Sequence, residues 1–278
     1  MMPGLYACGR ALLCEPVRDY IAALDAIRDR GYGGLAVAGV TFALAWFAYV
    51  PIHELFHAWG CMLAGGDVTR LEIAPEYGGA LLARVVPFVA SGSQYAGQLT
   101  GFDTHGNDAI YLATVLSPFL LTIVAGVPLL KRLARPLAHP ACRSHAGGNP
   151  CPMFRKRHWI PAFAGTTSNS SFPRAGPPLL GAVLPFAYAP FVSVPGDYYE
   201  AGSIVVSRLA HALDPALPLA RWRSDDVLKL ARELADSGAS AGDWLGVAAS
   251  LALGILLALL TYHAGGWAES LRRMRGSG

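Results

Sequence analysis

Residues 35–66 read "LAVAGVTFALAWFAYVPIHELFHAWGCMLAGG", an apolar stretch that also contains two histidines and one glutamate. A helix over residues 35–63 would be about 43 Å long, whereas the apolar core of a bilayer is about 30 Å thick. The stretch therefore predicts a transmembrane helix that tilts, bends or extends beyond the bilayer. Pro51 removes one backbone N–H donor, so we expect any bend to be there.

The composition of the whole chain agrees with a membrane protein. Only 15% of the 278 residues are charged, well below the roughly 25% of an average soluble domain. Three further apolar runs follow, at residues 109–130, 179–194 and 244–263. The third of the four runs is short and contains Pro185 and Pro190, as is common where a membrane protein builds a polar site. Trp244 and Tyr262, at the ends of the last run, are predicted interfacial anchors. The chain is predicted to be an all-α polytopic membrane protein with about four transmembrane helices.

The segments around these runs predict the domain organisation. Residues 1–34 are predicted to be an N-terminal amphipathic segment, since Arg10, Glu15 and Arg18 interrupt the apolar core that a signal peptide needs. The Gly-broken residues 67–107 predict a small strand-like or re-entrant loop after the first helix. Three larger divisions follow: a membrane-embedded core at 35–207, a soluble loop at 208–242, and a last transmembrane helix with a basic tail at 243–278. In the soluble loop, residues 224–237 predict an amphipathic helix with Ser224 as its cap and Gly238 at its end.

Residues 149–174 are rich in Pro, Ser, Thr and Arg and have no helical or strand period. They resemble peptides that arise when bacterial intergenic repeats are read as coding sequence, and are predicted to be a disordered insertion. A genuine basic cytoplasmic loop is the alternative. The segments before the first span, between the second and third spans, and after the last span together contain 15 Lys and Arg, against 7 in the other two loops. This distribution predicts both termini in the cytoplasm.

The motif His53-Glu54-Leu55-Phe56-His57 carries the candidate chemistry. Positions i and i+4 share one face of a helix, so both imidazoles can bind one metal ion. Zn²⁺ binds neutral imidazole nitrogen, and Glu54 is placed to accept a proton from water that the metal activates. The alternative is a pair of interfacial histidines with Glu54 facing water. Against it, an acidic residue inside a span costs roughly 2.5–3.5 kcal/mol, and such residues usually belong to a site.

The order of a transmembrane H-E-x-x-H, a Gly-containing semi-apolar loop and further spans resembles the site-2 protease family of membrane-embedded zinc metalloproteases, as a divergent member. The resemblance implies a third zinc ligand, an aspartate on a later span. Asp197, in "VSVPGDYYEAG" (192–202), is the counterpart, although the family's L-D-G and preceding Asn-Pro are absent. The resemblance also implies hydrolysis of a peptide bond in a membrane or membrane-proximal substrate, with Glu54 as catalytic base and acid. We expect the protein to lie in the bacterial cytoplasmic membrane.

Other assignments stay open at this point. Asp197 with Glu200 has the spacing of a capping box, so Asp197 can instead begin a helix. Glu200 is the reserve third ligand, since a His, His, Glu shell also suits zinc. Asp103 and His105 precede the second span and are more often a solvated turn than a site.

Two other kinds of function compete with hydrolysis. One is a non-catalytic membrane protein with a structural or sensory metal site, and the other is an inactive member of the protease family. The net charge of +3 and the lack of a basic helix argue against a nucleic-acid partner. The expected partners are the lipid bilayer and a protein or peptide substrate, while the oligomeric state is left open.

Overall fold

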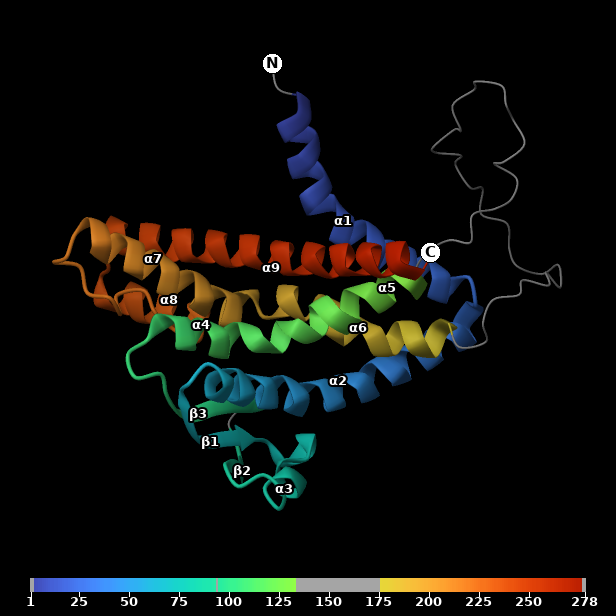
Figure 1. The fold of residues 1–278 in the computed structure, drawn as a ribbon, viewed down its shortest axis with the longest axis horizontal. Coiled ribbons are helices and arrows are strands. Elements are labelled where there is room, and N and C mark those ends of the chain that lie inside the picture. Colours follow the sequence, from blue (N-terminus) through green and yellow to red (C-terminus); the bar gives the residue numbers. More distant parts are fainter. Residues whose placement is uncertain (1–2, 94, 134–175, 277–278) are drawn as a thin grey trace.

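The computed structural model describes residues 3–93, 95–133 and 176–276, and its long helices lie side by side with a small sheet at one side (Figure 1). Four helical segments in these ranges are long and apolar enough to cross a membrane: Gly31–Leu63, Asp108–Leu133, Gly176–Leu213 and Ala241–Arg275. The protein is an all-α polytopic membrane protein, as its composition predicts. The predicted insertion at 149–174 lies outside the described residues.

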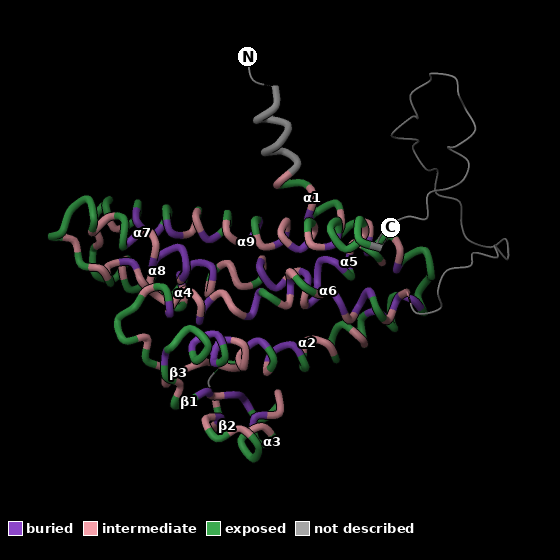
Figure 2. Tube along the Cα trace, viewed as in Figure 1, coloured by how far each residue is buried: buried purple, intermediate pink, exposed green. Residues whose placement is uncertain are grey.

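The first two helices are α1 (Pro3–Arg28) and α2 (Gly31–Leu63). Gly31, with φ of 71°, allows the tight turn between them. Helix α2 runs unbroken through Pro51 and is about 50 Å long. It begins at Gly31, four residues before the predicted start of the first span. It buries one side against the other helices and exposes Val40 and Leu44 on the other (Figure 2). Exposed apolar side chains of this kind suit a lipid environment.

The second and third spans are interrupted helices. The second consists of α4 (Asp108–Leu116), the short turns η2 (Ser117–Phe119) and η3 (Thr122–Gly126), and α5 (Val127–Leu133). The third consists of α6 (Gly176–Val192), the π-helical turn η5 (Val194–Tyr198) and α7 (Tyr199–Leu213). Because α7 continues to Leu213, the boundary predicted at 207–208 falls inside a helix. Interruptions of this kind are tolerated in membranes where they line a protein interior or a cavity.

The described part of the loop after α2 contains three strands, which agrees with the strand-like alternative predicted for residues 67–107. They are β1 (Asp67–Ile73), β2 (Val89–Ser91) and β3 (Gly97–Asp103), in the order β2-β1-β3. Strand β1 pairs in parallel with β2 and antiparallel with β3, while η1 (Pro75–Tyr77) and α3 (Gly79–Leu82) connect β1 to β2. Leu71 and Ile73 of β1 pack with Ala58 of α2. This contact fixes the sheet against the end of α2 that contains the histidine motif.

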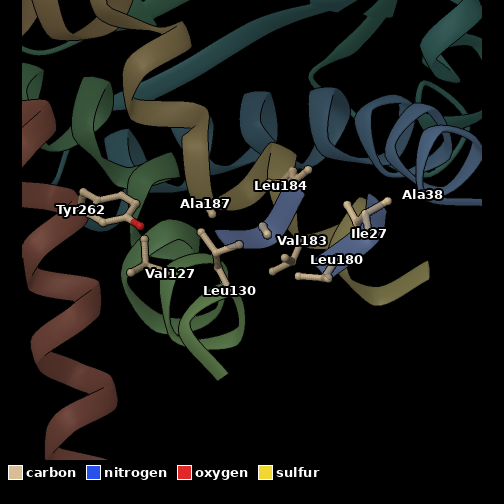
Figure 3. Packing of buried hydrophobic residues seen from close by; sticks show 10 residues of the cluster. Ile27, Ala38, Val127, Leu130, Leu180, Val183, Leu184, Ala187 and Tyr262 are labelled. Atoms are coloured by element: carbon tan, nitrogen blue, oxygen red, sulfur yellow. The ribbon is translucent and has the colours of Figure 1, made fainter. Parts of the chain in front are cut away.

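The largest core cluster joins α1, α2, α5, α6 and α9 (Ala241–Gly276) (Figure 3). Tyr262 of α9 is fully buried in this cluster, and its hydroxyl donates a hydrogen bond to Asp19 of α1 at 2.8 Å. The prediction that Tyr262 anchors the helix at the membrane interface is therefore wrong. Helix α9 continues for 36 residues, so position 262 lies within it and not at its end. Lys131 of α5 also bonds Asp19, at 2.9 Å, and thus ties α1 to the bundle.

The predicted amphipathic helix is α8 (Val227–Ser237), and it begins later than expected. Its N-cap is Asp226, whose Oδ1 accepts hydrogen bonds from the Leu228 and Lys229 backbone N–H groups. Ser224, the predicted cap, instead donates its hydroxyl to the backbone carbonyl of Asp226. Gly238 ends the helix in the left-handed conformation, as predicted.

Candidate metal centre

His53 and His57 lie one turn apart on α2, and both side chains are buried. Their Nε2 atoms are 3.1 Å apart, so the two rings point at one position between α2 and the neighbouring spans. The two rings converge because the i, i+4 spacing places both residues on one face of the helix. The predicted convergence of the two imidazoles is confirmed.

The other nitrogen of each ring has its own partner. Nδ1 of His57 lies 2.8 Å from the backbone carbonyl of Thr114 on α4. A carbonyl oxygen only accepts, so this Nδ1 donates and neutral His57 has its lone pair on Nε2. Nδ1 of His53 lies 2.6 Å from the hydroxyl oxygen of Tyr49, which can accept a hydrogen bond in the same way. Partners of this kind orient metal-binding histidines and fix their tautomer.

Asp197 reaches the two histidines from 144 positions farther along the chain than His53. Asp197 lies in the turn η5, which interrupts the third span. The preceding residue, Gly196, has φ of −106° and ψ of −109°, which are not helical values. Asp197 Oδ2 is 3.2 Å from Nε2 of His53, and Asp197 Oδ1 is 3.5 Å from Nε2 of His57. Asp197 does not cap α7, whose N-cap position is occupied by Tyr198 without a side-chain hydrogen bond. The alternative in which Asp197 and Glu200 form a capping box is therefore not observed.

The spacing of these three groups suits one metal ion. In a tetrahedral zinc site with bonds of about 2.0–2.1 Å, two ligand atoms are separated by about 3.3 Å. The three separations among His53, His57 and Asp197 are 3.1, 3.2 and 3.5 Å. Two lone-pair nitrogens and a carboxylate at these distances form a donor set that zinc accepts. These residues therefore fit a zinc ion in both chemistry and spacing.

Glu54 lies beside the histidines. One of its carboxylate oxygens lies within 4.8 Å of a ring nitrogen of each histidine. Its side chain passes directly over Gly97, the first residue of β3. A Cβ at position 97 would lie 2.4 Å from Cγ of Glu54, a contact that real structures do not show. The absent side chain of Gly97 therefore leaves the room that Glu54 occupies.

A cavity of about 630 Å³, here called the polar cavity, opens beside this group. Glu54, His57 and Asp197 line it, together with residues of β3, α4 and the segment before α8. Strand β3 is one of the two outer strands of the sheet, and β1 pairs with only one of its edges. Water and an extended chain can both approach Glu54 through a cavity of this size.

Glu200, the reserve ligand, also lines the polar cavity but has a different partner. It accepts a hydrogen bond from the Tyr111 hydroxyl at 2.5 Å. Within the described ranges, no hydrogen bond or ion pair joins Glu200 to either histidine. The geometry favours Asp197 over Glu200 as the third ligand.

Asp103 and His105 lie away from the group. His105 is exposed in the left-handed conformation and pairs with Asp67 at 3.3 Å and with Asp103 at 3.5 Å. Neither residue lines the polar cavity. They form a solvated turn, which is the interpretation that the sequence favoured.

Three supporting residues were not found from the sequence: Tyr49, Thr114 and Gly97. Tyr49 is four positions before His53, so helical spacing alone places it on the same face. Thr114 acts through its backbone carbonyl, and Gly97 through the absence of a side chain, so neither leaves a signal in one sequence.

Comparison of the chain with models of protein families, with curated proteins and with solved structures finds no match.

Proposed function

We propose that this protein is a membrane-embedded zinc metallopeptidase that hydrolyses a peptide bond of a membrane or membrane-proximal substrate. The observation that carries the proposal is the contact of Asp197 with both histidines of the H-E-x-x-H motif, at 3.2 and 3.5 Å. The motif alone is local, whereas this contact requires the third span to break at Gly196 and turn toward α2. The break brings the Asp197 carboxylate to the two imidazoles, which supports a zinc site with three protein ligands and a fourth position for water.

The cost of placing these groups in the bundle also supports a bound cation. Polar and ionisable residues within membrane spans are expensive and usually functional. When Tyr49 accepts from Nδ1 of His53, both Nε2 atoms present lone pairs to each other and to a carboxylate, with no proton donor between them. A divalent cation would compensate all three groups at once.

The residues then have separate roles. His53, His57 and Asp197 would hold the zinc ion, which supplies a Lewis acid that lowers the pKa of water and polarises a carbonyl. In this arrangement Glu54 would not bind the metal, and it lines the polar cavity. It would accept the proton of the attacking water and deliver it to the leaving amine. Tyr49 and the Thr114 carbonyl would hold the two imidazoles in the binding tautomer.

Strand β3 offers a way to present the substrate. Gln98, Leu99 and Thr100 of this strand line the polar cavity that contains Glu54. An extended peptide can add to the outer edge of a sheet through main-chain hydrogen bonds. Replacing Thr100 with proline would remove one N–H donor from this edge. Undiminished cleavage by Thr100→Pro would count against this mode of binding.

The resemblance to site-2 proteases supports the same proposal, through H-E-x-x-H, a Gly-containing semi-apolar loop and an aspartate after a proline-broken apolar run. The four apolar helices suggest a membrane-embedded protein. Its assignment to the bacterial cytoplasmic membrane is part of the proposal, tested by fractionating cells that express the tagged chain.

The experiment combines zinc content with cleavage. The wild type, Glu54→Gln and His57→Ala are purified in detergent with zinc, and zinc per chain is measured by mass spectrometry. Cleavage of a peptide library and of single-span membrane proteins is followed with the same samples. We expect about one zinc in the wild type and Glu54→Gln, much less in His57→Ala, and cleavage by the wild type alone.

Matched controls are Glu76→Gln and His105→Ala, two exposed positions away from the cavity. Both should retain the zinc content and the cleavage rate of the wild type. Wild-type protein that binds no zinc, or Glu54→Gln protein that cleaves as fast as the wild type, would contradict the proposal.

One observation favours a second candidate, a structural or sensory zinc site. Glu54 lies close enough to both histidines to be a fourth ligand, and structural sites have four protein ligands and no open position. The two candidates differ in what Glu54→Gln does. A structural site would lose zinc affinity in this variant, whereas a hydrolytic site would keep zinc and lose only cleavage.

A further inference from the structure

A second cavity, of about 300 Å³, lies beside the candidate metal centre and is here called the apolar cavity. Trp46 and Val50 of α2 and Ala189 and Val192 of α6 line it. Among its described lining residues, Glu54 is the one carboxylate and none is Lys or Arg.

The two cavities meet at the candidate catalytic residue. Glu54, Tyr95 and Gly97 line both of them, whereas His57 lines the polar cavity and His53 the apolar one. The proposed zinc ligands therefore lie at the boundary between the two. A chain that crosses this boundary passes Glu54 and moves from one environment to the other.

Strand β3 and the residues just before it extend along both cavities. Residues 98–100 and Phe102 of β3 line the polar cavity, and Tyr95 and Ala96, just before the strand, line the apolar one. Figure 1 shows β3 alongside α2, and Gly97 is the point at which β3 meets Glu54. A peptide extended along β3 with its scissile bond at Glu54 would thus have a neighbouring side chain at the apolar cavity.

We propose that the apolar cavity is a specificity subsite that accepts a large apolar side chain directly next to the scissile bond. This inference rests on the proposed hydrolysis. It defines the substrate class as peptides in which an apolar residue adjoins a polar, extended segment, as occurs where a chain enters a membrane.

The volume and lining of the cavity agree with this occupant. A dry cavity of roughly 150 Å³ is sufficient for benzene, and the apolar cavity is about 300 Å³. A Leu or Phe side chain can enter, while Asp or Lys would lose hydration in a cavity without a basic side chain to pair with Asp. Ala would fill little of it and gain little binding energy.

Val192 provides the perturbation. It is the last residue of α6 and is 56% exposed, so a larger side chain at this position can be accommodated without repacking the core. Val192→Phe should narrow the cavity. Val40→Phe, on an exposed part of α2 outside both cavities, is the matched control.

The test uses one peptide cleaved by the wild type, remade with Ala, Leu, Phe or Asp at each position flanking the scissile bond. At one of the two positions, wild type and Val40→Phe should cleave the Leu and Phe peptides at least about 10-fold faster than the Ala peptide. Val192→Phe should remove this preference while keeping the wild-type zinc content, whereas Val40→Phe should keep both the preference and the cleavage rates of the wild type.

The outcomes separate this inference from the function on which it rests. Wild-type cleavage without an apolar preference, or a preference that Val192→Phe leaves unchanged, would overturn the subsite and leave the hydrolysis standing. Failure of the wild type to cleave any peptide while it retains zinc would overturn both. A lipid that copurifies with the wild type and is lost from Val192→Phe would assign the cavity to an acyl chain and overturn the subsite.

Discussion

Replacing Gly97 with alanine should impair catalysis without removing the metal. The added Cβ would lie 2.4 Å from Cγ and 3.0 Å from Cδ of Glu54. A comfortable carbon–carbon contact needs about 3.5 Å, so the Glu54 side chain must move by about 1 Å. The three atoms nearest to the new methyl group all belong to Glu54 and none to the proposed zinc ligands.

The expected magnitude follows from this displacement. A misplacement of about 1 Å in a catalytic arrangement can lower the rate about 10²-fold, which corresponds to about 2.7 kcal/mol in the activation free energy. We therefore expect kcat/KM of Gly97→Ala to fall about 100-fold, with one zinc retained per chain. The assay is steady-state cleavage of the best wild-type peptide, with zinc measured on the same samples.

The matched control is Gly39→Ala on α2. A Cβ at this position meets nothing within 4 Å, and alanine replaces glycine in a helix with a gain of roughly 0.5–1 kcal/mol in stability. Its cleavage rate should equal that of the wild type. Unchanged kcat/KM in Gly97→Ala would refute the role given to the position of Glu54, and loss of zinc would refute the separation of Glu54 from metal binding.

Three other perturbations test the supporting geometry. Tyr49→Phe removes the hydroxyl that contacts Nδ1 of His53 and should lower zinc affinity about 10–100-fold; an unchanged affinity in a competition titration would remove this role. Gly254→Ala would place a Cβ 2.5 Å from the backbone carbonyl of Tyr198, next to Asp197, and should lower both zinc affinity and the free energy of unfolding by about 1–3 kcal/mol. Wild-type zinc affinity in Gly254→Ala would show that α9 does not position the Asp197 turn. Removing zinc with a chelator should lower Tm, since a ligand at 1,000 times its Kd stabilises the native state by about 4 kcal/mol; equal Tm values for metal-free and zinc-loaded protein would contradict metal binding to the folded state.

The features that the sequence predicted well are those with a local cause. Low charge and four apolar runs predicted the four candidate spans, because a bilayer requires long apolar helices. The i, i+4 spacing placed His53 and His57 together because helical geometry fixes it. Gly238 ends α8 as predicted because the left-handed conformation is a property of a single residue.

The features that the sequence did not determine depend on tertiary contacts. The selection of Asp197 over Glu200 needed the non-helical backbone at Gly196, which only the packed third span defines. Tyr262 looked like an interfacial anchor, since nothing local indicates that α1 packs over it and offers Asp19 as a partner. The N-cap of α8 is Asp226 and not Ser224 as predicted. Both residue types suit an N-cap, so the sequence could not decide at which of them the helix begins.

Zinc K-edge X-ray absorption of the purified protein, loaded with one equivalent of zinc, tests the central claim most directly. We predict a four-coordinate nitrogen and oxygen shell at about 2.0–2.2 Å with the scattering pattern of two imidazoles, and one imidazole fewer in His57→Ala. A wild-type spectrum without imidazole scattering, or the same spectrum from wild type and His57→Ala, would contradict a zinc site at His53, His57 and Asp197.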